Sequence, residues 1–398
     1  MASLDEVRAQ VAATRGDDHA HARAVLELAE REPLLGNRIA PVKAAIDGAA
    51  VVLDRVGSPE QRARLLLRLA SLKIVETDYD GADKALHAVG DQVPDHEALR
   101  FLTGVRACRI ALRRGPEDRN VARDMLLASA ARLPDFDTHD TIWQRVTSEV
   151  VLGAAEVGLH DEPSDAAAFA ALDELLDALA GDPAQIDLVF WGTQLRATYW
   201  MSLGDGPKTV AALRAVLKIA REVNSPADEV EARLALAGVL VELGDAISLD
   251  EAAHHVQIGR DRALAHNLST LHQAALIAQA GVLSHQGKTA GAIDRMLELA
   301  RSAAEAQDVP RYVAAVGIMA DLYARSGDAV AAFRTIAESN HALSQATRSD
   351  ATPLFRPLLA ALRDRIGSER LEQIAADIAK ASRLSRELDE KRVNNPTG

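Results

Sequence analysis

The amino-acid sequence predicts an all-α protein, a right-handed superhelical α-solenoid of antiparallel helical hairpins. Three observations predict this fold. The apolar residues are mostly Ala, Leu and Val, and only 3% of the 398 residues are aromatic, a composition that favours close packing of helices over a sheet core. Turns that contain glycine recur at a nearly constant spacing. Small residues follow these turns, so that a second helix can approach the first closely.

The repeat is clearest in the turns of the second half of the chain. The segments SLGDG, ELGDA, HQGKT and RSGDA place Gly204, Gly244, Gly287 and Gly327 at intervals of 40, 43 and 40 residues. Each glycine ends one helical apolar pattern and precedes another, as a residue that caps a helix in the left-handed conformation does. We therefore expect a helical hairpin around each of these turns. The pattern continues less regularly towards the N-terminus, where Gly115 marks a further turn.

The helical pattern divides the chain into four predicted segments. Residues 1–58 supply N-terminal capping helices, because the first hairpin of a stack needs a cover for its outer side. Residues 59–346 supply about seven hairpins, with helices of roughly 14 to 20 residues. Residues 347–392 form C-terminal capping helices, and residues 393–398 are expected to be a disordered tail. No linker rich in Gly, Ser or Pro interrupts the chain, so we expect no separate domains.

The repeated segment resembles the tetratricopeptide repeat (TPR) family. The resemblance rests on the turns YDGADKAL, LGDG and SGDAVAAF. The preceding helices contain the matching small and apolar residues Leu236, Ala237, Leu240, Met319, Ala320 and Tyr323. The usual unit of the family has 34 residues and an early aromatic residue, whereas here the repeat has about 40 residues and most early aromatics are missing, as in the long-helix variants of bacterial signalling proteins. The resemblance implies a solenoid with a concave groove that binds a peptide or helix of a partner protein.

Charge and cysteine content limit the class of protein. The formal net charge of −13 argues against nucleic acid or an anionic membrane as a partner, because both require a surplus of Lys and Arg. Cys108 is the single cysteine and cannot form an internal disulfide, and the start MASLDEVRAQ is acidic where a secretory signal would be basic. No segment offers the ~18 apolar residues of a membrane span. These features predict a cytoplasmic protein, and the Ala-rich composition is typical of a bacterial genome rich in G and C.

Four of the thirteen aromatic residues lie in the segment LVFWGTQLRATYWMSLGD, residues 188–205. Most of them are expected to fill the core between hairpins, including Phe190 and Tyr199. A second face of the same helix carries Trp191, Gln194, Thr198 and Met201, spaced i, i+3, i+7 and i+10. This face is a candidate for the partner-binding groove, because exposed aromatic and Met side chains make adaptable contacts with peptides. The alternative is that Trp191 also belongs to the core.

A second candidate part of the groove is basic and lies on two neighbouring helices. Its residues are Arg64, Arg68, Arg106, Arg109 and Arg113. Guanidinium groups form bidentate pairs with carboxylate or phosphate, so an acidic peptide or a carboxyl terminus could bind there. Glu149 and Glu156 follow on the next hairpin and reverse the sign of the charge. The alternative is a solvated helix face whose arginines pair with nearby carboxylates.

The sequence offers little support for an enzyme, a cofactor or a metal site. Asp135, Asp137, His139 and Asp140 form a ligand-like cluster, but they follow a proline at a position where helix-capping residues are expected. The remaining histidine pairs, His19 with His21 and His254 with His255, lack the spacing and the partners of a zinc site. No phosphate loop, dinucleotide glycine pattern or nucleophile elbow is present. We therefore expect no catalytic residue, no cofactor and no metal.

The sequence favours a protein-interaction scaffold or adaptor that binds a peptide or helix of another protein in its groove. The alternative is a signalling regulator that senses a peptide and changes its contacts with a partner, because small shifts between hairpins add along a repeat array. Residues 1–58 are too short and too acidic for a helix-turn-helix DNA reader, so such a regulator would act on another protein. A homodimer is possible if the ends of the array leave apolar surface uncovered.

Overall fold

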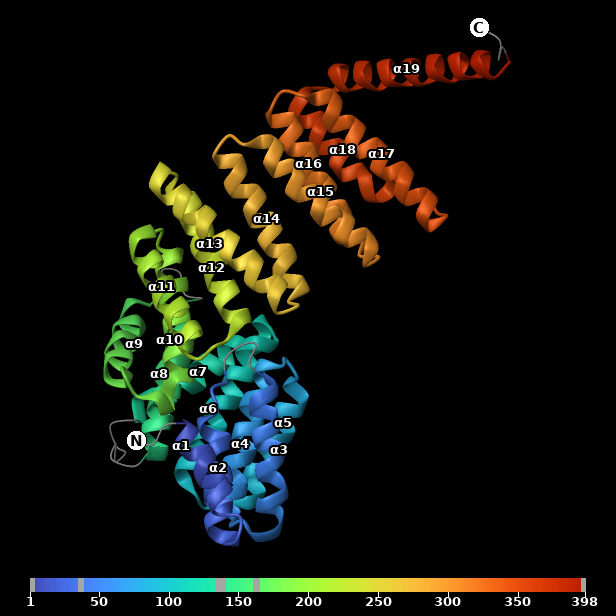
Figure 1. Cartoon of the computed structure of the whole chain (residues 1–398). Helices are drawn as coiled ribbons and strands as arrows, with labels where there is room; N and C mark the ends of the chain where they lie inside the picture. The colour runs from blue at the N-terminus through green and yellow to red at the C-terminus, as the bar shows by residue number, and fades with distance from the viewer. Residues whose placement is uncertain (1–3, 35–38, 133–140, 160–164, 395–398) are drawn as a thin grey trace. The chain divides into compact units, whose positions relative to one another are not determined.

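The computed structural model describes residues 4–34, 39–132, 141–159 and 165–394 (Figure 1). Within these residues the chain forms nineteen α-helices and one short 3-10 helix, and it contains no β-strand. The prediction of an all-α protein is therefore confirmed. None of the helices in the described part of the chain has both the length and the apolar character needed to cross a membrane.

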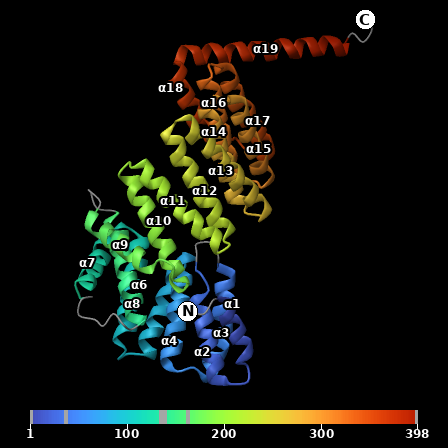
Figure 2. The same ribbon diagram turned by 60° about the vertical axis from the view of Figure 1, so that its left-hand side comes forward.

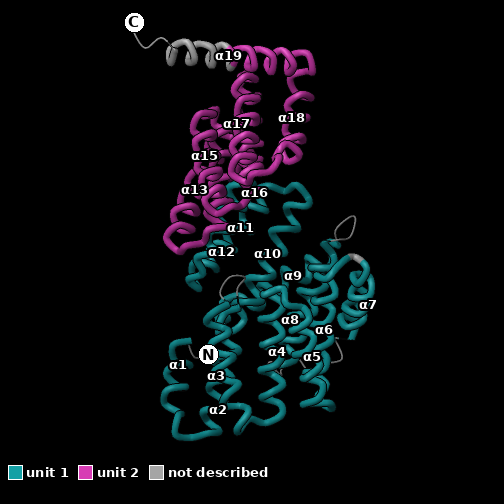
Figure 3. Tube along the Cα trace, turned by 90° about the vertical axis from the view of Figure 1, so that its right-hand side faces the viewer, with its two compact units in different colours: residues 1–239 teal, residues 240–398 magenta. Residues whose placement is uncertain are grey.

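The helices form two compact units, which we call unit 1 (residues 1–239) and unit 2 (residues 240–398) (Figure 3). The division falls within helix α12 (Pro226–Leu243). It lies inside the predicted repeat segment and not at either end of it. The two units are described separately below.

Unit 1 contains eleven α-helices before α12, and most of them pair with the next helix along the chain. The elements are α1 (Leu4–Ala13), α2 (Asp18–Arg31), α3 (Ile39–Val56), α4 (Pro59–Val75), α5 (Tyr79–Gln92), α6 (Glu97–Arg114), α7 (Pro116–Arg132), α8 (Thr141–Gly158), α9 (Ala166–Leu179), η2 (Pro183–Gln185), α10 (Ile186–Ser202) and α11 (Gly206–Glu222). In addition, α4 packs on α6, α6 on α8 and α8 on α10 (Figures 1 and 2). We call these four helices the A layer, and this layer carries the candidate site.

Unit 2 repeats the same kind of packing, in which each helix contacts its successor. Its helices after α12 are α13 (Ala246–Ala265), α14 (Ser269–His285), α15 (Thr289–Glu305), α16 (Val309–Arg325), α17 (Ala329–Thr347), α18 (Thr352–Ile366) and α19 (Ser368–Asn394). A core of small and apolar residues runs from α14 to α19. The predicted tail 393–398 lies mostly outside the described residues, and its first two residues end α19.

The glycine turns have the conformation that the repeat predicts. Gly204, Gly244, Gly287 and Gly327 have φ values of 69°, 72°, 72° and 87°, in the left-handed region that glycine adopts without strain. Three of the four are followed by an aspartate that caps the next helix; for example, the carboxylate of Asp328 accepts a hydrogen bond of 2.8 Å from a backbone N–H of α17. The turn sequence thus ends one helix and begins the next.

Other turns use the same conformation without glycine. Asn224, Asn267 and Gln307 have φ values of 52° to 56° and lie in the turns that follow α11, α13 and α15. Asn tolerates the left-handed conformation better than most residues. Gly115, in contrast, has an extended φ of 168°, so the turn between α6 and α7 does not use the left-handed cap.

The core of unit 1 contains the aromatic residues that the sequence assigns to it. Phe190 and Tyr199 of α10 are both buried, and the Tyr199 ring stacks on Phe169 of α9 with 3.8 Å between ring centroids. Gly192 lies between them in sequence and faces three leucines of α8 and α9 at close range. The buried side of α10 therefore fixes where its opposite side, with Trp191, is presented.

Candidate functional site

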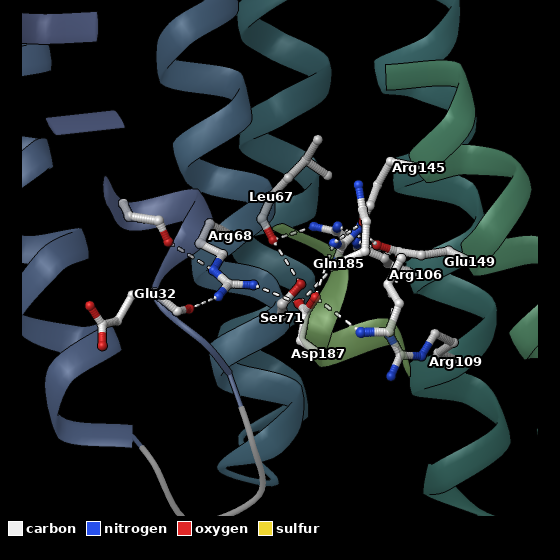
Figure 4. A network of polar contacts seen from close by, with 12 residues as sticks. Glu32, Leu67, Arg68, Ser71, Arg106, Arg109, Arg145, Glu149, Gln185 and Asp187 are labelled. Atoms are coloured by element: carbon white, nitrogen blue, oxygen red, sulfur yellow. Dashed lines mark hydrogen bonds and ion pairs between the residues drawn. The ribbon is translucent and has the colours of Figure 1, made fainter. Parts of the chain in front are cut away.

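A network of buried charges joins the four helices of the A layer (Figure 4). Its members are Arg68 of α4, Arg106 and Arg109 of α6, Arg145 and Glu149 of α8, and Asp187 of α10. Arg68 and Arg106 are each 5% exposed and Glu149 is 1% exposed. Buried charges at this depth require partners with good geometry, because removing an ion from water costs several kcal/mol.

Glu149 is the carboxylate around which the arginines gather. Arg106 donates to both of its oxygens, from Nη2 at 2.6 Å and from Nε at 2.9 Å. Arg145, one helical turn before Glu149, donates from Nε at 2.9 Å. Burial alone would raise the pKa of Glu149, but the Arg106 and Arg145 charges hold it well below its ordinary value. Glu149 is therefore an anion that holds two helices together.

Asp187, at the start of α10, closes the network on the other side. Arg145 donates to it from Nη2 at 3.0 Å, and Arg68 donates from Nη1 at 3.2 Å. Burial would raise the pKa of Asp187, but Arg145 and Arg68 lower it to about 2. Because Arg68 lies in α4, this carboxylate connects helices that are 119 residues apart in the chain.

Arg68 also completes the end of α2. Its Nε donates to the main-chain oxygen of Ala29 at 3.0 Å, and its Nη2 donates to the main-chain oxygen of Glu32. The last carbonyl groups of a helix have no partners within the helix. A side chain from α4 therefore supplies hydrogen bonds that a glycine turn would otherwise provide.

Arg109 differs from the other arginines of the network. Its guanidinium lies over the ring of Trp191 with 3.6 Å to the ring centroid, and it donates no hydrogen bond to any residue that the structure describes. Its nearest carboxylate contact is Nη1 to Glu149 Oε2 at 4.0 Å, and its enclosed Nε has no acceptor. The side chain is only 12% exposed. Burial lowers the pKa of Arg109 to about 10, and the nearby Arg113 charge acts in the same direction.

The exposed side of α10 continues from Trp191. Gln194, Thr198 and Met201 are exposed, and the Met201 side chain leaves 54% of its residue surface open. These three residues follow Trp191 at helical spacing, so they share its face over about 15 Å at the α-helical rise. The structure thus places the four predicted residues of α10 on one face, with an arginine of α6 stacked at one end of it.

The two remaining predicted arginines form ion pairs at the surface. Arg64 of α4 pairs with Glu30 of α2 at 2.6 Å, and Arg113 of α6 pairs with Glu156 of α8 at 3.3 Å. Both arginine side chains keep about a third of their surface exposed, at 35% and 32%. They flank the buried network and do not take part in it.

Two of the predicted groove residues require correction. Arg68 and Arg106 are buried in the packing between helices and cannot line an open surface. The helical spacing places them correctly on one side of α4 and α6, but this side packs against neighbouring helices that bring Glu149 and Asp187 to it. Sequence reasoning did not identify Arg145 and Asp187 as members. The spacing of Arg145 and Glu149, i and i+4, is a helix-pair signal that could have indicated the first.

No metal-binding cluster or reactive thiol accompanies the network. The described residues contain no group of three or more His, Cys, Asp or Glu side chains that could hold a metal ion. The predicted alternative cluster of Asp135, Asp137, His139 and Asp140 lies outside the described residues. Cys108 is buried, and burial raises the pKa of its thiol to about 11, which keeps it protonated and unreactive at neutral pH.

Unit 2 contains a separate apolar hollow of about 300 Å³. It lies between α15, α16 and α17, and its lining includes Leu297, Tyr312, Met319 and Tyr323. It has no arrangement of desolvated charge comparable to that around Arg109. The A-layer face is therefore the stronger candidate for a specific ligand.

Comparisons with known proteins agree with this architecture. No protein-family model and no curated protein matches the chain. Among solved structures, the chain is similar to a signal transduction ATPase with numerous domains (STAND) that has a tetratricopeptide repeat sensor, from Pyrococcus horikoshii, with a TM-score of 0.59 and 15% identity. The match covers 94% of this chain and 54% of that protein, so the chain spans about half of its length.

A second solved structure is a Rap protein complexed with competence and sporulation factor, with a TM-score of 0.47 and 15% identity, over 98% of this chain and all of that one. At such low identities, structural likeness indicates fold and not activity. The helical content, the paired packing and the left-handed glycine turns agree with the first match. The chain has the fold of a TPR-like helical solenoid.

Proposed function

We propose that the chain is a peptide-binding repeat protein and that the exposed face of α10, together with Arg109 of α6, holds an extended segment of a partner protein. One observation carries the proposal. The Arg109 guanidinium is largely removed from water and stacked on Trp191, yet it has no hydrogen-bond acceptor among the described residues. A desolvated donor without an acceptor is costly, and a ligand would supply one.

The composition of the face fits such a ligand. Trp191 and Met201 supply apolar contact at its two ends, and Gln194 and Thr198 supply polar groups between them. Aromatic and Met side chains are enriched where proteins bind peptides. An extended chain advances about 3.3 Å per residue, so the ~15 Å between the ends of this face correspond to about five residues of a bound segment.

A sensing role is the second candidate, and the buried network favours it. Glu149, which lies 4.0 Å from Arg109, is also the main partner of Arg106 and Arg145. A ligand that moves Arg109 therefore acts on a carboxylate that holds α6 to α8. The similar STAND protein is described as having a TPR sensor. In a sensor the bound segment would alter the packing of unit 1, whereas a simple adaptor would bind it without such a change.

The test is selection from a random peptide library displayed on phage, with synthesis of the selected sequences and measurement of their affinity by fluorescence polarization. Trp191→Ala should weaken binding by at least about tenfold, as truncation of an aromatic anchor does. Trp200→Ala is the matched control. Trp200 is half-buried in the same helix and contacts Lys208, but nine residues beyond Trp191 it points to the opposite side. This control should change affinity by less than about twofold.

Hydrogen exchange then separates the two roles. Protection of amides throughout the A layer on peptide binding would favour the sensor. Protection confined to α10 and the neighbouring part of α6 would favour the adaptor. If the library gives no binder, or if the two tryptophan variants weaken binding equally, the proposal fails.

A further inference from the structure

We infer that the ligand of this face carries a carboxylate, which pairs with Arg109 beside Trp191. The inference rests on the proposed peptide-binding function and specifies the chemistry of the bound segment. It starts from the balance of charge in the A layer. The arginines in or next to the network are Arg68, Arg106, Arg109, Arg113 and Arg145, and the carboxylates that pair with them are Glu149, Glu156 and Asp187. Five cations face three anions, an excess of two positive charges.

The excess is not shared evenly among the arginines. Arg106 and Arg145 each donate hydrogen bonds to carboxylates, and Arg68 is bound to Asp187 and to two main-chain oxygens. Arg113 pairs with Glu156. Arg109 has only the 4.0 Å contact with Glu149, whose two oxygens already accept hydrogen bonds from other arginines. The uncompensated charge is therefore concentrated at Arg109.

The stacking on Trp191 limits the shape of an anion that can bind. With 3.6 Å between the guanidinium and the ring centroid, one face of the planar group is covered, and its Nε is enclosed. The ligand must therefore approach the terminal nitrogens in or near the guanidinium plane. A carboxylate is planar and pairs with this edge through two parallel hydrogen bonds.

A phosphate group fits less well. A tetrahedral anion is usually bound by donors that converge from several directions, and the neighbouring arginines that could converge here already donate to Glu149 and Asp187. Main-chain carbonyl groups would accept from Arg109 but would leave the excess charge uncompensated. The observations therefore favour an Asp or Glu side chain, or a carboxyl terminus, over either alternative.

The position of Met201 sets the spacing within the ligand. Met201 lies on the same face of α10, about 15 Å from Trp191 along the helix axis, and is 54% exposed. A segment with a carboxylate at Arg109 and an apolar side chain about four or five residues away would contact both ends of the face. The order of these two residues is left to the experiment.

The experiment compares synthetic twins of peptides selected from the phage library. In each pair, Asp is replaced by Asn or Glu by Gln, and a free C-terminus is compared with its amide. Wild-type protein should bind one acidic member at least about tenfold more tightly than its neutral twin, as expected for a partly desolvated charge pair. Arg109→Gln should bind both twins with nearly equal affinity.

Two further variants keep the result interpretable. Arg196→Gln removes an arginine of α10 that pairs with Asp173 of α9, away from the Trp191 face, and should retain the preference for the acidic twin. Arg109→Lys retains the charge without the planar fork and should keep a reduced preference. This variant provides the measurement if Arg109→Gln does not fold.

The possible outcomes are distinct. Equal binding of the twins by the wild-type protein would overturn the carboxylate inference and leave the peptide-binding function standing. Tighter binding of a phosphoserine twin than of the Glu peptide would overturn the choice of a planar anion. An unchanged preference in Arg109→Gln would show that the carboxylate binds elsewhere. If no peptide is selected at all, the proposed function fails, and the inference fails with it.

Discussion

Arg68 in α4 and Asp187 in α10 form an ion pair in the interior of unit 1, with 3.2 Å between Nη1 and Oδ2. Asp187 also accepts from Arg145 of α8, so a single carboxylate compensates two buried guanidinium groups. Removing one member of such a group leaves uncompensated charge in a medium that solvates it poorly. The stability of unit 1 should therefore depend strongly on this carboxylate.

Asp187→Ala should lower the free energy of unfolding of unit 1 by about 3 to 5 kcal/mol. All three tryptophans of the chain lie in residues 1–239, so urea unfolding followed by tryptophan fluorescence reports on unit 1. The matched control is Asp173→Ala. Asp173 is 47% exposed in its pair with Arg196, and its loss should cost less than about 1 kcal/mol. Equal effects of the two substitutions would contradict the role given to the network.

Acid should destabilise unit 1 in a defined range of pH. The pKa of Asp187 is about 2 in the folded protein against an ordinary value of 3.8, so the folded state favours the ionised form. The corresponding stability is fully present above pH 4 and is lost as the pH falls from about 4 to about 2. Glu149, whose pKa is also lowered, acts in the same direction. The urea midpoint, again followed by fluorescence, should fall over this range, and the fall should be smaller in Asp187→Asn.

Two glycines associated with α14 should respond to alanine with opposite signs. Gly287 has φ of 72° at the end of this helix, where a Cβ is strained whatever the space around it. Gly287→Ala should therefore lower stability by about 1 kcal/mol. Gly281 lies within α14, where a Cβ would have no neighbouring atom within 4 Å, and Gly281→Ala should raise stability by about 0.5 to 1 kcal/mol. Thermal unfolding followed by circular dichroism checks both, and a common sign would rule out this explanation of the turn.

Gly192→Ala should disturb the support of Trp191. A Cβ at this position would lie 2.9 to 3.1 Å from methyl groups of Leu152, Leu172 and Leu176. Such overpacking typically costs about 1 to 3 kcal/mol, and it would move the segment that holds Trp191 over Arg109. Fluorescence-detected unfolding and peptide affinity should both decrease. Gly238→Ala, at an unobstructed position in α12, should leave both readouts close to wild type.

The turns show how far the sequence alone carries the fold. Gly204, Gly244, Gly287 and Gly327 could be recognised because glycine is the usual residue in the left-handed conformation, and all four adopt it. The intervening turns at Asn267 and Gln307 adopt the same conformation, but nothing about these residue types requires it. The period of the hairpins was therefore predictable from half of its turns.

The site was less predictable, and the reason is geometric. Helical spacing places Arg106 and Arg109 on related faces of α6, but it does not say which helix covers each face. Arg106 meets a carboxylate 43 residues further along the chain, whereas Arg109 meets the ring of Trp191. Three residues thus separate a buried, fully paired arginine from one that lacks an acceptor. Only the packing of α8 and α10 on α6 distinguishes them.

The hydrogen bonds of Arg68 have a consequence for the order in which the nascent chain matures on the ribosome. Arg68 donates to the main-chain oxygens that end α2 and takes its counter-ion from Asp187. A growing polypeptide that has released α4 but not α10 contains the guanidinium without that counter-ion. The first helices therefore reach their final arrangement only after nearly half of the protein has been translated, and a terminator placed ahead of codon 187 should yield a product that chaperones retain.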